Sequence, residues 1–109
     1  MSSKTTDIVF FLTVLNSPEL RDSYETWVRE VDTPMSLKLA GVESYRVVRL
    51  TDSPVLDGDS APSYSYIEII EVSDLAAYKA AIAGAPASFF EQFSTYIGSY
   101  QSVVGSVIN

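Results

Sequence analysis

The sequence predicts an α+β fold in which helices pack against one antiparallel sheet of four strands. Strand-like and helix-like stretches follow one another in the order β-α-β-β-α-β, which is the split βαβ pattern of the ferredoxin-like fold. The length of 109 residues is typical of one domain, expected over residues 1–109. Two of the four strand-like runs are apolar at both odd and even positions, which predicts that both faces of the sheet are covered.

The chain opens with a predicted strand and a predicted amphipathic helix. Residues 8–15 are rich in β-branched and aromatic side chains, which favour a strand. Ser17 is expected to cap the following helix, and Pro18 suits its first position. Apolar side chains then recur at helical spacing, and the opposite face, with Glu25 and Arg29 as a charge pair four residues apart, is expected to face solvent.

A proline predicts an interruption of this helix. Because Pro34 disfavours α geometry at Thr33, the helix is expected to end or kink near Asp32. A short second helix is then expected to run to Leu39, with Gly41 closing it. A carboxylate at a helix C-terminus is disfavoured by the helix dipole. Asp32 is therefore interpreted as the cap of the short helix or, alternatively, as a base that points into a pocket.

The remaining elements complete the pattern. The predicted strands are residues 42–51, 64–72 and 100–108, and the predicted helices are residues 74–83 and 87–97. Residues 52–63 hold two prolines, three aspartates and three serines and predict a long loop, for which a lid over a pocket is one interpretation. The acidic spacing in this loop lacks the full EF-hand pattern, so no calcium site is expected.

The predicted fold leaves one sheet face without helices. Residues 8–15 and 42–50 offer apolar side chains to both faces, and an uncovered apolar face is an association surface. We therefore expect a homodimer in which two copies pack sheet to sheet, which is a dimeric α+β barrel. The alternative is a monomer whose second sheet face is only less polar than average.

The composition excludes several classes of chemistry. The chain has no cysteine and no histidine, so disulfides, thiolate nucleophiles, the Ser-His-Asp triad and His-ligated metals or haem are excluded. Fourteen acidic against seven basic residues give a net charge of −7, which argues against nucleic acid and an anionic membrane as partners. The only long apolar run is too short for a transmembrane helix, and no leader peptide is recognised, so a cytoplasmic location is expected. No metal, flavin or other cofactor is expected.

Glu68 is the first candidate for chemistry. Alternation along residues 64–72 places Tyr66, Glu68 and Ile70 on one face of a strand. A carboxyl group among aromatic rings loses hydration, which raises its pKa toward the range useful for acid–base catalysis. The alternatives are a solvent-facing side chain on an edge strand and a structural ion pair with an arginine.

The neighbouring strand supplies the possible partners of Glu68. Tyr45 and Arg49 share one face of residues 42–51, and Arg46 lies on the other. The long connecting loop leaves the strand register open, so the two arginines are equal candidates for a salt bridge to Glu68. Either arginine could instead clamp a carboxylate or keto group of a ligand.

Tyr24 and Trp27 lie on the apolar stripe of the first helix. Core packing is one interpretation, because aromatic side chains dominate cores. The other is that they line a flat aromatic pocket between helix and sheet. One Trp, seven Tyr and five Phe make such a pocket plausible in a chain of this length.

Three stretches resemble a known family. Residues 24–32 with Pro34 close behind, residues 42–49 and residues 64–74 are similar to the REDY-like family of the dimeric α+β barrel superfamily. The resemblance implies a dimeric barrel and a place in secondary metabolism, in prodiginine-type tripyrrole or bisindole pigment biosynthesis.

The resemblance and the candidate residues together predict a function. The protein is expected to bind a flat pyrrole or indole intermediate and to promote its cyclisation, condensation or tautomerisation without a cofactor. The expected catalytic residues are Glu68, Asp32 and Tyr66, and the expected substrate-binding residues are Tyr24, Trp27, Tyr45, Arg46 and Arg49. The alternatives are a cofactor-free monooxygenase of the same barrel class and a non-catalytic protein that shields a reactive intermediate.

Overall fold

The structure, a computed structural model, describes residues 7–109 and contains one antiparallel sheet. Its four strands lie in the order β2-β3-β1-β4. Together with the helices this is a ferredoxin-like α+β fold, which confirms the predicted fold class. The domain was expected to cover residues 1–109, and the N-terminus was also searched for a leader peptide. Residues 1–6 lie outside the described residues.

The elements follow the predicted order with small differences in their bounds. The strands are β1 (Asp7–Leu15), β2 (Val42–Arg49), β3 (Tyr66–Val72) and β4 (Ile97–Ser106). The helices are η1 (Pro18–Leu20), α1 (Arg21–Trp27), η2 (Val28–Asp32), α2 (Thr33–Ser36), α3 (Leu75–Ala83) and α4 (Ala87–Tyr96). β4 begins at Ile97 instead of Tyr100, because Ile97 leaves α4 in extended geometry and its side chain is buried in the core. No helix within residues 7–109 is long and apolar enough to cross a membrane.

The helix does not end before Pro34, but its regular α geometry is interrupted there. Thr33 keeps helical angles, with φ of −63° and ψ of −49°, and the helix continues into α2. The preceding turn, η2, is instead a π-helical turn, in which the N–H of Thr33 donates to the carbonyl of Val28 five residues back. A wider turn relieves the clash between a proline ring and the carbonyl of the turn before it, so the helix widens where it was expected to end or kink.

Two expected caps differ in the structure. Asp32 stands at the N-cap position of α2 but its side chain makes no capping hydrogen bond. Ser17 has the extended geometry of an N-cap, yet its hydroxyl donates to the carboxylate of Glu19 and leaves the helix end uncapped. Asp74 does cap α3, because its carboxylate accepts the N–H of Ala77 at 3.0 Å.

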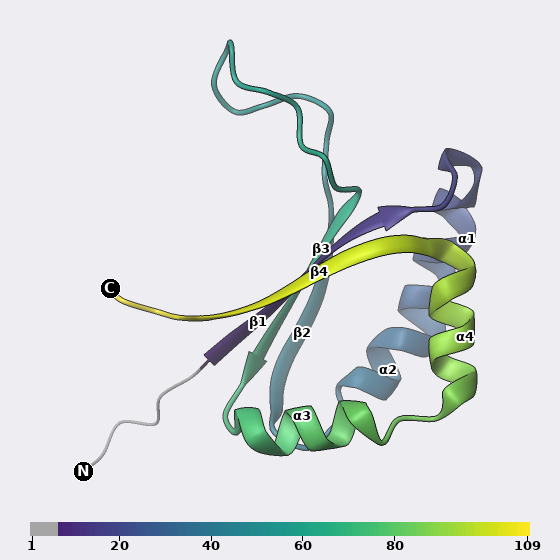
Figure 1. Cartoon of the computed structure of the whole chain (residues 1–109), viewed down its shortest axis with the longest axis vertical. Coiled ribbons are helices and arrows are strands. Elements are labelled where there is room, and N and C mark those ends of the chain that lie inside the picture. Colours follow the sequence, from purple (N-terminus) through teal and green to yellow (C-terminus); the bar gives the residue numbers. More distant parts are fainter. Residues whose placement is uncertain (1–6) are drawn as a thin grey trace.

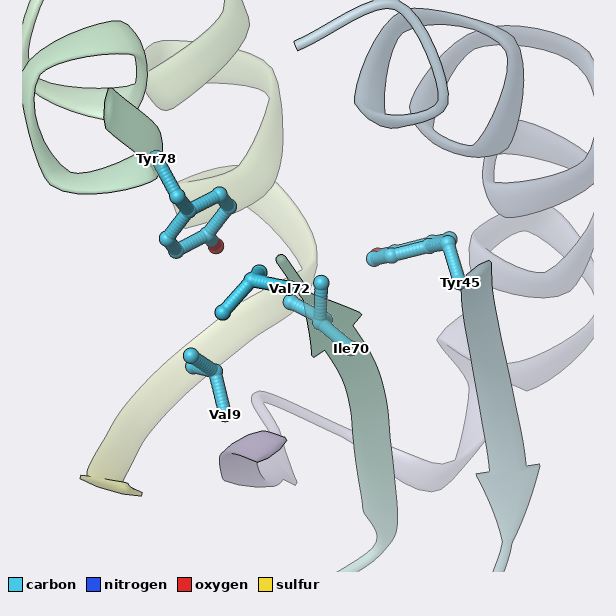
Figure 2. Close-up of a cluster of buried hydrophobic side chains, with 5 residues drawn as sticks. All are labelled: Val9, Tyr45, Ile70, Val72 and Tyr78. Carbon is cyan, nitrogen blue, oxygen red and sulfur yellow. The ribbon is translucent and has the colours of Figure 1, made fainter. Parts of the chain in front are cut away.

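The helices lie on one face of the sheet, and the core forms between them (Figure 1). The inward face of β3 alternates as expected, with Tyr66, Glu68, Ile70 and Val72 buried. The core has two clusters. The first holds Val9, Tyr45, Ile70, Val72 and Tyr78 (Figure 2), and the second holds Tyr24, Trp27, Val28, Tyr66 and Ile97.

The other sheet face is free of helices (Figure 1) and apolar at its centre. The strand registers pair Phe10 with Ile69 and with Val103, and Leu12 with Ile67. These side chains point away from the helix-covered face, because they alternate with the buried residues of the same strands. The open face is therefore the surface on which a second copy was expected to pack.

The connection between β2 and β3 projects beyond the sheet as an irregular arm (Figure 1). This agrees with the long loop predicted for residues 52–63. Val55 in this connection is 98% exposed. None of the residues 52–63 lines the cavity that holds the buried carboxyl groups described below, and the interpretation of this loop as a lid stays a prediction.

Candidate active site

A cavity of about 220 Å³ lies between the sheet and the helices and contains two buried carboxyl groups. Its polar residues are Asp32, Ser36, Tyr45, Glu68 and Ser94. Its other lining residues are mostly aromatic: Phe11, Ile70, Tyr78, Ile82, Phe89, Phe90, Phe93 and Tyr100. A mainly apolar cavity with a few convergent polar groups is typical of a small-molecule site.

The fold brings the three central polar groups together from separate elements. Glu68 lies in the middle of β3, opposite Phe11 of β1 and Val47 of β2, and the strand alternation turns it inward. Tyr45 lies on the same face of β2. Asp32 is the last residue of the π-helical turn, which directs its side chain toward the sheet. Glu68 is 7% exposed and Asp32 is 4% exposed.

The hydroxyl of Tyr45 bridges the two carboxyl groups. Its oxygen lies 2.8 Å from Oε1 of Glu68 and within hydrogen-bond distance of Oδ2 of Asp32. Ser36, one turn after Asp32, donates its hydroxyl to Oδ1 of Asp32 at 3.3 Å. A phenol has one proton, so it can donate to only one of the two carboxyl groups. The other contact is a hydrogen bond only if that carboxyl group is itself protonated.

Burial decides which carboxyl group holds the proton. Desolvation, with the nearby negative charge of Asp32, raises the pKa of Glu68 to about 8, although the hydrogen bond from Tyr45 opposes the rise. Desolvation raises the pKa of Asp32 to about 6, against hydrogen bonds from Tyr45 and Ser36. Near neutral pH, Glu68 is therefore a neutral acid that donates to Tyr45, and Tyr45 donates to the ionised Asp32.

This arrangement can act as a three-membered proton relay. One end holds a carboxylic acid that can give a proton, and the other holds a carboxylate that can accept one. Two titratable groups whose environments separate their pKa values are the usual basis of an acid and base pair. The phenol pKa of Tyr45 is raised well above its usual range by desolvation and by both carboxyl groups, so the phenol stays protonated at neutral pH and can both donate and accept a hydrogen bond.

Aromatic rings form the walls of the cavity. Tyr100 lies 6.0 Å from Phe11 and 5.9 Å from Phe93 between ring centroids, and Phe89 lies 5.6 Å from Phe90. Figure 2 shows the rings of Tyr45 and Tyr78 reaching toward the same region from β2 and α3. Offset and edge-on ring contacts favour a flat aromatic ligand over a compact aliphatic one.

Tyr24, Trp27 and Tyr66 occupy other places than the expected pocket. Tyr24 and Trp27 pack in the second core cluster with ring centroids 6.1 Å apart, which is the core interpretation. The indole N–H of Trp27 donates to Gln92 at 2.7 Å. The hydroxyl of Tyr66 donates a hydrogen bond to Glu25 at 2.7 Å. Tyr66 does not line the cavity that contains Asp32 and Glu68.

Neither arginine meets Glu68, which corrects the expected salt bridge. Arg49 binds Glu25 of α1 through two hydrogen bonds of 2.6 Å. This contact also corrects the expected solvent exposure of Glu25, whose side chain is only 13% exposed. Arg46 is exposed at the edge of the sheet. This pairing depends on the strand register, in which Val47 lies opposite Glu68 and Arg49 lies opposite Tyr66. The register could not be predicted from the sequence, because a long loop connects the two strands.

Sequence reasoning missed several lining residues. Tyr78 and Phe93 lay on predicted apolar helix faces, but such faces do not distinguish a cavity wall from a filled core. Ser36 could have been predicted, because it follows Asp32 by four residues and so shares its helix face.

A larger hollow of about 770 Å³ lies between the end of β1 and the ends of the 50–65 connection and contains neither buried carboxyl group. Within residues 7–109, no three acidic side chains gather as a metal site.

Comparison with known proteins adds a family and a fold. A family model described as REDY-like protein HapK matches residues 7–108. No curated protein matches the sequence. The crystal structure of HapK from Hahella chejuensis is similar, with a TM-score of 0.75 and 22% identity over 94% of this chain and 93% of that one.

Two further solved structures share the fold. A dabb family protein with a ferredoxin-like fold from Mesorhizobium loti has a TM-score of 0.67 and 13% identity, covering 96% of this chain and 99% of that one. SnoaB from Streptomyces nogalater, a cofactor-independent oxygenase, has a TM-score of 0.61 and 15% identity, covering 98% and 96%. These likenesses bear on the arrangement of sheet and helices.

Proposed function

The chain belongs to the REDY-like HapK family, and on this premise we propose that it binds a flat pyrrole or indole intermediate of secondary metabolism and moves protons on it with Glu68, Tyr45 and Asp32. The family match confirms the resemblance first found in residues 24–32, 42–49 and 64–74. Prodiginine-type tripyrrole and bisindole pathways, in the cytoplasm, are the proposed setting. The observation that carries the proposal is the phenol of Tyr45 shared by two buried carboxyl groups inside an aromatic cavity.

The cavity favours a small ligand. Its volume of about 220 Å³ is below the roughly 300 Å³ at which sites for drug-sized molecules begin. A one- or two-ring pyrrole or indole therefore suits it better than a complete tripyrrole. The proposed substrate is an intermediate that enters or leaves the assembly of a pigment.

The proposed step is a tautomerisation that adds one proton and removes another. Glu68, as the neutral acid, gives its proton to a nucleophilic ring carbon of the pyrrole or indole. Asp32, as the carboxylate, accepts the proton of the ring N–H. The product is the ring-protonated tautomer, which is electrophilic and prepared for cyclisation or condensation. The ligand gains and loses one proton, so its charge does not change.

The relay then restores the site without solvent. After the step Glu68 is ionised and Asp32 is protonated. Asp32 passes its proton to the oxygen of Tyr45 as Tyr45 passes its own to Glu68, because all three groups remain in hydrogen-bond contact. The buried site thus never carries more than one net negative charge, which limits the cost of burying two carboxyl groups.

Hydrogen–deuterium exchange on a simple indole tests this proposal. We expect the protein to accelerate loss of the C3–H signal of 2-methylindole in D2O, followed by proton NMR. Glu68→Gln and Asp32→Asn should each abolish the acceleration, while Glu91→Gln, which removes an exposed carboxylate outside the cavity, should leave it unchanged. Binding of the indole with no acceleration in the wild type would contradict catalysis and support a protein that only shields an intermediate.

A cofactor-free monooxygenase is the second candidate function. It is favoured by the aromatic cavity with one ionised carboxylate, which could take the proton of an electron-rich phenol. SnoaB, which shares the fold, is a cofactor-independent oxygenase. Oxygen uptake with a quinol distinguishes the two functions. Uptake that depends on Asp32 supports the oxygenase, and its absence beside active exchange supports the tautomerase.

We further propose that a second copy covers the open sheet face. Phe10, Ile69 and Val103 lie side by side at the centre of that face and no described helix covers them (Figure 1). A face that is apolar on every copy is complementary to itself about a two-fold axis. The proposed assembly is a homodimer in which both aromatic cavities stay on the helix-covered sides.

A further inference from the structure

Two opposite charges lie beside the apolar centre of the open sheet face. Arg46 of β2 lies opposite Ile69, and Glu71 follows Ile69 by two residues along β3, so alternation puts all three on this face. The other residues that the strand registers place there are uncharged, Phe10 and Val103 among them. Arg46 is exposed and Glu71 is half-buried, so both side chains lie on the surface that the proposed second copy would cover.

Neither charge has a partner in the described part of the chain. Arg46 and Glu71 take part in no hydrogen bond or ion pair within residues 7–109. They are diagonal neighbours on adjacent strands, for which Cβ atoms lie roughly 7–8 Å apart, yet no ion pair joins them. Arg49, by contrast, lies on the helix-covered face and binds Glu25 through two hydrogen bonds of 2.6 Å. The open face therefore keeps one positive and one negative group unpaired.

A second copy on this face would take both groups out of water. A buried charge loses its hydration, and a partner of opposite charge offsets that loss. Since residues 7–109 supply no such partner, the facing copy is the remaining source of one. It carries the same two groups, one of each sign, so the face is complementary to itself in charge as well as in its apolar centre.

The geometry of a two-fold assembly allows these groups to meet. A two-fold axis between facing sheets exchanges two positions when it passes midway between them. An axis that crosses midway between Arg46 and Glu71 and runs obliquely over Ile69 meets this condition and also brings the two apolar centres together. The strands of the two sheets then cross at a steep angle, which is one of the two common ways in which sheets pack. Facing sheets lie about 10 Å apart, a gap that an arginine and a glutamate side chain span together.

We propose that Arg46 of each copy forms an ion pair with Glu71 of the partner subunit, so that two symmetric ion pairs flank the apolar centre of the dimer. This inference rests on the homodimer proposed above and adds to it the groups that fix how the copies are oriented. Apolar contact is not directional, so an apolar face alone tolerates several orientations. Opposite charges that meet in one orientation favour it over the others.

Charge reversal at the two positions tests the proposal. Arg46→Glu places like negative charges opposite each other across the interface, and Glu71→Arg places like positive charges there. We expect each variant alone to dissociate about a hundredfold more readily than the wild-type dimer, as measured by sedimentation velocity. When the two variants are mixed, opposite charges face each other again at both positions, so a heterodimer should form. The variants differ in mass, so native mass spectrometry resolves the heterodimer from each homodimer.

Arg21→Glu and Glu91→Arg are the matched controls. They make the same changes in net charge at exposed helix residues, so they should dimerise like the wild type. This comparison separates a contact at the open face from a general effect of net charge on association. Far-UV circular dichroism equal to that of the wild type excludes loss of folding in every variant.

Each outcome decides the matter. Single variants that are weak alone and form a heterodimer on mixing support ion pairs between copies. A mixture that stays monomeric while the double variant Arg46→Glu/Glu71→Arg dimerises shows that the two groups pair within one chain, which overturns the proposal. Single variants that dimerise as tightly as the wild type also overturn it but leave the homodimer standing, whereas a monomeric wild type overturns both.

Discussion

Tyr45 links two carboxyl groups that would otherwise be isolated in the core. Its hydroxyl contacts both Asp32 and Glu68. The sequence could place Glu68 on the buried face of a strand and predict the direction of its pKa shift, because both follow from alternation and desolvation. It could not bring Asp32 to Glu68, because that contact depends on the helix turn and the strand register together.

The relay predicts a bell-shaped dependence of indole exchange on pH. Catalysis needs Asp32 ionised and Glu68 protonated, so the rate should rise near pH 6, fall near pH 8 and peak between them. Tyr45→Phe removes the hydrogen bond that lowers the pKa of Asp32, so the rising limb should move to higher pH. A rate profile that Tyr45→Phe lowers uniformly without moving would contradict the relay.

Glu68 also predicts how the free energy of unfolding depends on pH. The folded side chain keeps its proton to about pH 8, whereas the unfolded one loses it near pH 4.5. Between these values the folded state binds more protons, so stability falls as pH rises, by an amount on the order of 5 kcal/mol. Urea unfolding at pH 5 and pH 8 measures this.

Glu68→Gln should remove most of that slope, because glutamine does not titrate. Asp32 adds a smaller fall between about pH 4 and pH 6, in the same direction. Glu25 has a lowered pKa, so its stabilisation is lost only in stronger acid and is constant over this range. An equal slope in wild type and Glu68→Gln would show that the carboxyl group of Glu68 is ionised throughout.

At the scale of elements, the helical segment from Pro18 to Ser36 shows which features local sequence rules can predict and which they cannot. The order and placement of strands and helices could be predicted, because periodicity and turn residues define them. The rule that residues before proline avoid α geometry located the irregular turn correctly, but Thr33 itself keeps α angles and the helix continues. The wide turn at Val28–Asp32 absorbs Pro34, and it is this turn that presents Asp32 to the cavity.

Pro34→Ala should therefore separate stability from activity. Alanine lets the turn return to α geometry, which should raise the free energy of unfolding by about 1–2 kcal/mol, since proline inside a helix is unfavourable. The same change rotates Asp32 away from Tyr45 and should slow indole exchange. Melting curves and the exchange assay measure both effects.

Pro18→Ala is the matched control, because Pro18 lies in the first helical turn, where proline is tolerated. It should bring little change in either quantity. Unchanged exchange in Pro34→Ala would mean that the π-helical turn is not needed to place Asp32.

At the scale of the molecule, the two faces of the sheet have different surroundings. The helix-covered face holds the core and the relay, and the open face holds an apolar patch (Figure 1). The sequence could predict this division, because residues 8–15 and 42–50 are apolar at both odd and even positions. The sequence could not predict the walls of the cavity. Phe89, Phe93 and Tyr100 come together only when α4 and β4 fold back over β1.

Ile69→Lys should convert the proposed dimer to a monomer. A charge at the centre of the open face would be buried without a partner in the assembly, but would reach solvent in a single chain. Sedimentation velocity measures the change. Val55→Lys, on the projecting arm, is the control and should leave the assembly unchanged. A wild-type protein that sediments as a monomer at all concentrations would contradict the proposed assembly.

The most direct test of the relay is a titration of its two carboxyl groups by carbon-13 NMR, with the side-chain carboxyl carbons of Asp and Glu labelled and assigned through Glu68→Gln and Asp32→Asn. The structure predicts that Asp32 titrates near pH 6 and Glu68 near pH 8, so that one is ionised and the other protonated at neutral pH. If both carboxyl groups titrate below pH 5, Glu68 has no proton to give at neutral pH and the proposed mechanism is contradicted.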